Sequence, residues 1–260
     1  MLYSPTQIAL IALIMTSGAV VQGAIGFASG LLGVPLLVLS GFSVPEAATI
    51  NLVSTSVQNF TGTWKLWSHL QPRELIFPVI VRWLGIPLGA YVVWLADTHL
   101  APSQAKQMIG ALLLVIVALL WVCRVRPRDH LNLFWQTLAF SASGFMLGFA
   151  AMGGAPLVLY VNALTWTAAK SRAFLFFCST TGLPVAAVIF WLKFGTKILP
   201  AALTTLLLLP LIFAGLFLGL RLGHQLPKPL FRKITLGLVI LIAIGSIFGP
   251  MIADQYAASH

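Results

Sequence analysis

One arginine lies inside a long apolar run of the chain. Arg82 follows Arg73 by nine residues, which is about 14 Å along a helix, and no other residue from 75 to 96 is charged. The acidic residues fall at the ends of apolar runs or between them, at Glu46, Glu74, Asp97, Asp129 and Asp254. A buried guanidinium without a carboxylate matches an oxyanion well, because its planar donors reach two oxygens at once. Arg82 is therefore a candidate anion ligand, unless its side chain extends to the headgroup region instead.

A second group of polar residues recurs at helical spacing. Between 45 and 67 the spacing places five residues on one helix face: Asn51, Thr55, Gln58, Asn59 and Gly62. The corresponding positions of the run 166–191 are Arg172, Phe176, Ser179, Thr180 and Leu183. Polar side chains inside a span face the protein interior by default, so both faces predict a binding site. The alternatives are hydrogen bonds to neighbouring helices and, for Arg172, a side chain that extends to the interface.

Two glycine-rich breaks interrupt the apolar pattern. One runs from Gln22 to Gly30 and the other from Gly144 to Gly154. Half-helices that open near Gly33 and Gly154 would direct free N–H groups and a partial positive charge toward mid-membrane, which attracts anions. The alternative is that these glycines only permit close helix packing. The candidate site at the breaks comprises Gln22, Gly26, Gly30, Gly33, Gly148, Gly153 and Gly154.

The composition excludes an ordinary soluble domain. Of 260 residues, 59% are hydrophobic and 8% are charged, whereas soluble domains carry about 25% charged residues. The net charge of +10 comes from basic residues that lie mostly between apolar runs, which is typical of topology signals and not of a nucleic-acid patch. The two cysteines have no metal-ligand or disulfide pattern. We expect no cofactor, no metal and no nucleic-acid partner.

The apolar runs predict ten helical segments. They are 5–22, 31–41, 45–67, 74–96, 103–123, 131–148, 154–164, 166–191, 198–220 and 229–249. Two of them, 31–41 and 154–164, are shorter than the roughly 20 residues that a full crossing needs. If each glycine break returns the chain to its starting side, eleven basic residues lie on one side of the membrane and three on the other. The positive-inside rule then places both termini outside the cytoplasm.

The two halves of the chain resemble each other. Gly-Phe-Ala occurs at 26–28 and at 148–150, and Gly33-Val-Pro-Leu matches Gly154-Ala-Pro-Leu. Further on, the Gly-x-x-x-Gly segments at 85–89 and 215–219 correspond. Five segments per half is an odd number, so the second half enters the membrane inverted, as in many secondary transporters. We predict repeat halves 1–124 and 131–260, joined by a basic cytoplasmic linker 125–130.

The predicted fold is therefore an all-α polytopic membrane protein with two inverted repeats of about five helical segments each. In each half the first two segments form a glycine-broken helical hairpin. The breaks with their Gly-x-Pro ends, together with the late Gly-x-x-x-Gly helices, resemble the TauE/SafE sulfite exporter family of membrane permeases. The resemblance implies transport of sulfite, thiosulfate or organosulfonates across the inner (plasma) membrane.

The predicted function is a secondary transporter, an exporter of small sulfur-containing anions by alternating access, whose partners are the anion and the lipid bilayer. An enzyme is not expected, because the histidines map to loops or ends and no carboxylate lies mid-span. The alternative is an anion channel or a structural membrane subunit. No pattern in the sequence specifies a coupling ion or an oligomeric state.

Overall fold

All named elements of the computed structural model are helices. It describes residues 3–25, 29–122 and 128–225 and the single positions 237, 240 and 244. In chain order the helices are α1 (Pro5–Ile25), α2 (Ser29–Leu39), α3 (Val44–Leu66), α4 (Pro72–His99), α5 (Pro102–Val122), α6 (Leu133–Ala150), α7 (Gly154–Asn162), α8 (Ala168–Phe194) and α9 (Leu199–Gln225), with short 3-10 helices η1 (Trp67–His69) and η2 (Gly195–Ile198). These bounds lie within five residues of the first nine expected segments. The tenth, 229–249, lies outside the described residues except for those three single positions.

Local sequence signals set several of the helix starts. Ser43 caps α3 in a capping box with Glu46, whose carboxylate accepts from the Ser43 backbone N–H at 2.9 Å. Asn132 caps α6, and Thr167 caps α8 through the backbone N–H of Lys170. These caps satisfy N–H groups that have no partner within their own helix.

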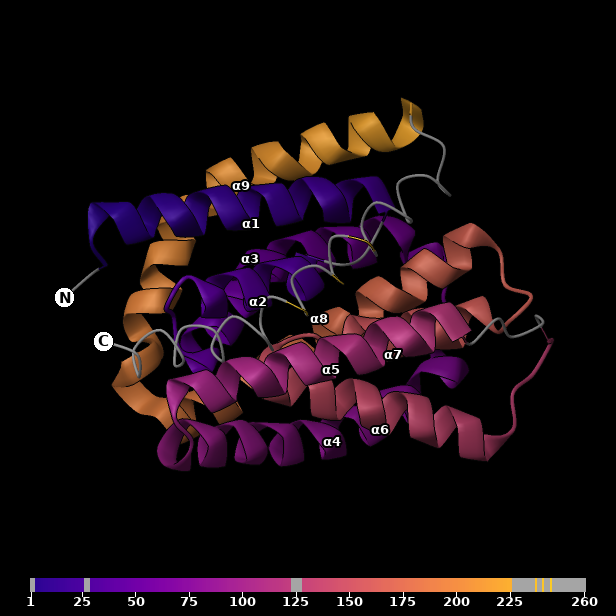
Figure 1. Cartoon of the computed structure of the whole chain (residues 1–260). Helices are drawn as coiled ribbons and strands as arrows, with labels where there is room; N and C mark the ends of the chain where they lie inside the picture. The colour runs from indigo at the N-terminus through magenta and orange to yellow at the C-terminus, as the bar shows by residue number, and fades with distance from the viewer. Residues whose placement is uncertain are drawn as a thin grey trace.

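The most extensive helix contacts join the two halves of the sequence. α4 packs along α6, α9 packs along α1, and α3 packs on α8. In Figure 1, α1 and α9 lie along one flank of the bundle, and α4 and α6 lie along the opposite flank.

Glycines allow the backbones of these paired helices to come close. A Cβ on Gly85 would lie 2.8 Å from the carbonyl oxygen of Ser141 in α6, and one on Gly215 would lie 2.7 Å from that of Thr16 in α1. Real Cβ atoms essentially never come within 3.0 Å of a neighbour. The Gly-x-x-x-Gly segments therefore serve as packing faces, as small residues do in membrane helix interfaces.

Each glycine break is followed by a short helix that leads back toward the start of the preceding one. Before α1, the Tyr3 hydroxyl donates to Glu46 at the start of α3 at 2.8 Å. Burial and the Glu46 carboxylate raise the pKa of Tyr3, so this hydroxyl stays a donor. Before α6, the backbone N–H of Arg128 donates to the carbonyl of Ala163, directly after α7, at 3.0 Å. In each case the chain leaves the short helix at the end of the bundle where the preceding long helix began.

The start of the first short helix differs from the sequence-based expectation. α2 begins at Ser29 and not near Gly33, so Pro35 lies inside the helix and not in its first turn. The glycine does not break this helix, because it packs on α1, where a Cβ on Gly33 would lie 3.0 Å from the Met15 sulfur. α7 begins at Gly154, as expected, with Pro156 in its first turn.

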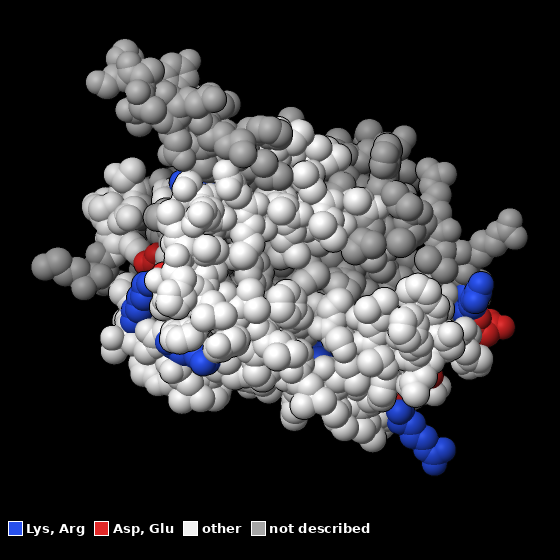
Figure 2. All heavy atoms as spheres, turned by 60° about the horizontal axis from the view of Figure 1, so that its bottom comes forward, with Lys and Arg blue, Asp and Glu red and all other residues white. Residues whose placement is uncertain are grey.

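The surface between the two ends of the bundle is apolar. Figure 2 shows most of the charged side chains at the two ends of the molecule and uncharged residues between them. Large hydrophobic side chains are exposed along the helices, with Trp64 at 78% and Leu84 at 70%. Four described stretches are long and apolar enough to cross a bilayer: Pro5–Gly23, Pro72–His99, Leu133–Ala150 and the run Ala169–Gly219 across α8 and α9. The chain is a multi-pass helical membrane protein.

Candidate functional site

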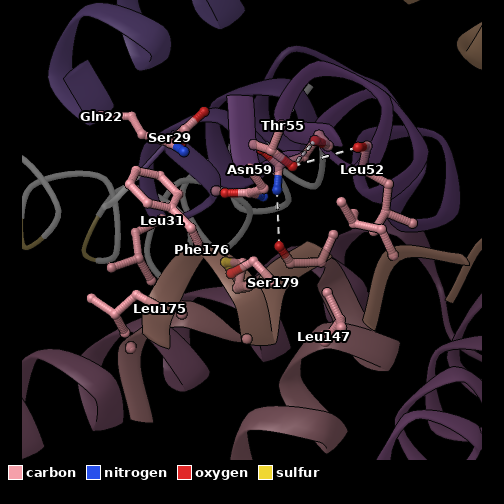
Figure 3. A pocket seen from close by; sticks show the side chains of 18 of the residues that line it. Gln22, Ser29, Leu31, Leu52, Thr55, Asn59, Leu147, Leu175, Phe176 and Ser179 are labelled. Atoms are coloured by element: carbon pink, nitrogen blue, oxygen red, sulfur yellow. Dashed lines mark hydrogen bonds between the residues drawn. The ribbon is translucent and has the colours of Figure 1, made fainter. Parts of the chain in front are cut away.

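A cavity of about 80 Å³ lies between the two glycine breaks. Helices α1–α4 and α6–α8 contribute to its wall, which includes residues of both breaks. A buried water needs about 10–15 Å³ of such space, so the cavity has room for several waters or one small polyatomic anion. Figure 3 shows polar side chains of α3, among them Thr55 and Asn59, facing Ser179 and Phe176 of α8 across it.

The starts of the two short helices meet at this cavity. Ser29, Gly30 and Leu31 of α2 line it, as do Gly154 and Ala155 of α7. A Cβ on Gly30 would lie 3.1 Å from the carbonyl oxygen of Ala151, so the α2 start touches the second break directly. A helix start presents N–H groups without intrahelical partners. The start of α7 therefore provides N–H donors and partial positive charge at the cavity.

Backbone geometry at the second break turns one carbonyl toward α3. Ala151 ends α6 in the left-handed conformation, with φ 55, which is uncommon for a residue with a Cβ. Its carbonyl accepts a hydrogen bond from the Asn51 side-chain amide at 2.8 Å. The strained residue thus ties the second break to the polar face of α3.

Arg82 reaches the cavity from α4 and is held there by neutral groups. The side chain is 1% exposed. Its Nε donates to the Ser143 hydroxyl at 2.9 Å, and its Nη1 donates to the carbonyl of Cys178 in α8. Ser143 in turn donates to the carbonyl of Gly153 in the second break. The sequence offered no acidic partner, and the ion pairs Lys170–Glu74 and Lys197–Asp97 do not involve Arg82.

The remaining donors of Arg82 lie beside the break. A Cβ on Gly153 would lie 3.3 Å from Nη2, and one on Gly182 would lie 3.6 Å from the same atom. The absence of a Cβ at Gly153 and Gly182 thus leaves space next to this nitrogen. Arg82 lines the cavity beside these two glycines.

Three buried polar atoms near the cavity have no hydrogen-bond partner in the described part of the chain. They are Ser29 Oγ, Asn51 Oδ1 and Gln58 Oε1. Ser29 and Asn51 line the cavity, whereas Gln58 does not. Buried polar groups are nearly always paired, and unpaired ones at a cavity wall are typical of a site that a ligand completes.

The predicted site residues divide into two groups. Eight of them line the cavity: Gln22, Gly30, Asn51, Thr55, Arg82, Gly153, Gly154 and Ser179. Five do not: Gly33, Gly148, Gln58, Arg172 and Thr180. Gly26 lies outside the described residues.

Each residue of the second group has another environment. Gly148 packs on the Ile86 carbonyl of α4, and Thr180 shares a hydrogen bond with Thr63 at 2.9 Å. Gln58 donates to the carbonyl of Ser54. Arg172 is exposed near the start of α8. Gly148 and Thr180 thus lie in contacts between helices, and Gly33 packs on α1.

Sequence reasoning missed the groups that hold Arg82. Ser143 lies in an apolar run without a visible polar pattern, and the Cys178 partner is a backbone carbonyl. The one available signal was the depth of Ser143 in the sixth segment, because a hydroxyl there also needs a partner. No group of three or more His, Cys, Asp or Glu residues with metal-binding geometry occurs in the described ranges.

Comparison with known proteins gives one match. The model of the family described as "Sulfite exporter TauE/SafE" matches residues 10–246. No curated protein and no solved structure matches the chain.

Proposed function

Because the chain belongs to the TauE/SafE sulfite exporter family, we propose that it exports small sulfur-containing anions, such as sulfite, thiosulfate or organosulfonates, by alternating access around the cavity beside Arg82. The family is one of membrane permeases, and the chain is accordingly a membrane transporter. The substrate, the direction and the mechanism are the proposed parts.

The observation that carries the proposal is the charge balance of the cavity. Its described wall contains one guanidinium and two helix starts, and it contains no carboxylate. All three features favour a negative ligand. Against a wall of protein atoms such interactions are stronger than in bulk solvent.

We assign the anion to the lining residues of the predicted site. Arg82 Nη2 and the N–H groups at the starts of α2 and α7 would donate to its oxygens. Gln22, Thr55 and Ser179 complete the wall around it. Ser143 acts as a positioning residue, because its hydroxyl accepts from Nε and orients the guanidinium.

An inverted repeat accounts for the helix contacts. Under the proposed correspondence, α4 and α9 are equivalent, and so are α1 and α6. The α4–α6 and α1–α9 contacts are then the same interface used twice, as a two-fold axis requires. Rocking of these paired units about α3 and α8 would open the cavity to alternate sides.

The proposed orientation places the start of α4 in the cytoplasm. Glu74 and Lys170 pair at that end of the bundle, and Asp97 and Lys197 pair at the other. Most basic residues of the chain fall near the first end: Lys65, Arg73, Arg128, Lys170, Arg172 and Arg221 among the described ones. The positive-inside rule then assigns that end to the cytoplasm and the N-terminus to the opposite side.

Sulfite flux in proteoliposomes tests the function. We expect protein-dependent efflux that saturates with sulfite concentration and is lost in Gly154→Val, which fills open space at the cavity. Efflux that rises linearly without saturation would indicate an anion channel. Absence of any protein-dependent movement of sulfite, thiosulfate or an organosulfonate would overturn the proposal.

A further inference from the structure

Asn51 leaves one unpaired acceptor at the cavity wall. Its Nδ2 donates to the Ala151 carbonyl at 2.8 Å. Because a carbonyl can only accept, this bond fixes which end of the amide faces Ala151. The other atom, Oδ1, is therefore an acceptor, and it has no partner among the described residues. The side chain is 2% exposed, so the oxygen needs a donor from the cavity, either a water or a ligand that replaces it.

The cavity also carries a single positive charge. Arg82 of α4 is the only titratable residue in its described wall, and the parts of α1, α2, α3, α6, α7 and α8 that line it are neutral. The Cys178 thiol lies in α8 behind the guanidinium, whose Nη1 donates to the carbonyl of the same residue. Arg82 carries the full charge of this wall and the helix starts add partial positive charge to it, so the cavity favours a negative ligand.

The positive wall calls for an anion and the unpaired acceptor calls for a donor, and a protonated oxyanion provides both. We propose that the transported species is a monoprotonated oxyanion, such as hydrogen sulfite, whose acidic hydrogen bonds to Asn51 Oδ1 while its oxygens accept from Arg82 and the two helix starts. The inference rests on the proposed function. A sulfite dianion has acceptors only, so its oxygens would face Asn51 Oδ1 with no hydrogen between them. Sulfate, which is unprotonated near neutral pH, would be rejected for the same reason.

The proposal predicts the sign of a pH change inside vesicles. If hydrogen sulfite leaves, sulfite that remains takes up protons to restore the equilibrium, and the lumen becomes more alkaline. If the dianion leaves, the remaining hydrogen sulfite releases protons, and the lumen becomes more acidic. The two forms of the substrate therefore give opposite signals from one trapped dye.

The experiment uses the full chain in proteoliposomes loaded with sulfite and a pH-sensitive dye, with potassium and valinomycin present to compensate charge. Protein-free vesicles loaded in the same way measure the pH change and sulfite loss caused by neutral sulfur dioxide that crosses the lipid unaided. We expect alkalinisation above that background, accompanied by sulfite efflux measured chemically. Acidification with efflux would overturn the proposal and leave the proposed function intact. No efflux above background would contradict the proposed function itself.

Binding to the purified protein provides a second readout. Since only the protonated fraction binds, the apparent Kd for total sulfite should rise about tenfold per pH unit on the alkaline side of the sulfite transition. Methanesulfonate, a monoanion at every pH used, is the control, and its affinity should stay constant. If the affinity for both ligands falls equally as the pH rises, a group of the protein is titrating, and the proposal is contradicted. If sulfite binding requires Na⁺, Asn51 Oδ1 would be assigned to a cation, and the proposal would also be contradicted.

Asn51→Leu tests the residue directly. If the variant unfolds, the dye signal of the unmodified protein still decides the question. If it folds, both anions lose any contribution of the Asn51–Ala151 bond, and we expect hydrogen sulfite to lose about tenfold more affinity than methanesulfonate, which has no hydrogen to donate. An equal loss for both anions would show that Asn51 shapes the cavity without accepting from the ligand.

Discussion

Two adjacent glycines in the second break have opposite surroundings, and this contrast gives a sharp prediction. A Cβ on Gly153 would lie 2.5 Å from the Ser143 carbonyl oxygen and 2.8 Å from the Leu147 Cβ. A Cβ on Gly154 would meet nothing within 4 Å. Gly153 has φ −67 and ψ −1, which alanine adopts without strain, so packing alone separates the two positions.

The expected stability changes follow from these contacts. Gly153→Ala should destabilise the protein by about 1–3 kcal/mol, because the backbone of α6 or the break must move. Gly154→Ala should be neutral or stabilise by up to about 1 kcal/mol through the lower entropy of the unfolded chain. Gly153→Ala should also weaken anion binding, because Ser143 supports Arg82.

Unfolding of the two variants in the same detergent, followed by temperature or denaturant, measures the difference. Gly154→Ala should unfold at or above the midpoint of the unmodified protein, and Gly153→Ala should unfold below it. Equal midpoints, or a lower midpoint for Gly154→Ala, would refute the assigned packing of the break. If Gly154→Ala folds normally, it also serves as the matched control for the larger substitution Gly154→Val.

Three further predictions follow from the packing and the proposed site. Ser143→Ala removes the hydroxyl that accepts from Arg82 and donates to Gly153. It should weaken sulfite binding about 5- to 10-fold, measured by titration of the purified protein. Unchanged affinity would show that Ser143 does not position Arg82. Gly89→Ala and Gly219→Ala each place a Cβ against a carbonyl of the paired helix, so both should lower the free energy of unfolding by about 1–3 kcal/mol. Gly41→Ala has open space but φ +100, so it should lose only about 1–2 kcal/mol of stability through backbone strain. A Gly89→Ala protein as stable as the unmodified one would contradict the α4–α6 interface. A reporter active only outside the cytoplasm should give a signal when fused to either terminus, and a signal from a cytoplasmic reporter would reverse the proposed orientation.

Much of the helix pattern was predictable because the hydrophobic runs are long and their ends carry caps. The run containing Arg82 became α4, and both glycine breaks fall where the composition changes. The start of α2 was misplaced because a glycine reads the same in sequence whether it breaks a helix or packs inside one. The contact between Gly33 and Met15 decides between the two, and that contact is tertiary.

The site was partly predictable for a related reason. A charged or amide side chain in an apolar run must find a partner, so Arg82, Asn51 and Thr55 could be selected from the sequence alone. The partner of such a side chain depends on how the neighbouring helix is rotated about its axis and how deep it sits in the membrane. Neither quantity can be read from the local sequence. Arg172 and Gln58 share the helix positions of the predicted site, and only three-dimensional packing separates them from Ser179 and Asn51.

The central claim is that the cavity beside Arg82 binds an oxyanion, and sulfite affinity of Arg82→Lys tests it most directly. Lysine keeps the positive charge but cannot donate to Ser143, the Cys178 carbonyl and a ligand in the planar geometry of arginine. At pH values where hydrogen sulfite is abundant, the folded variant should bind sulfite about 10- to 150-fold more weakly, equivalent to about 1.5–3 kcal/mol. A folded Arg82→Lys protein with the affinity of the unmodified chain would contradict the assignment of the anion to this cavity.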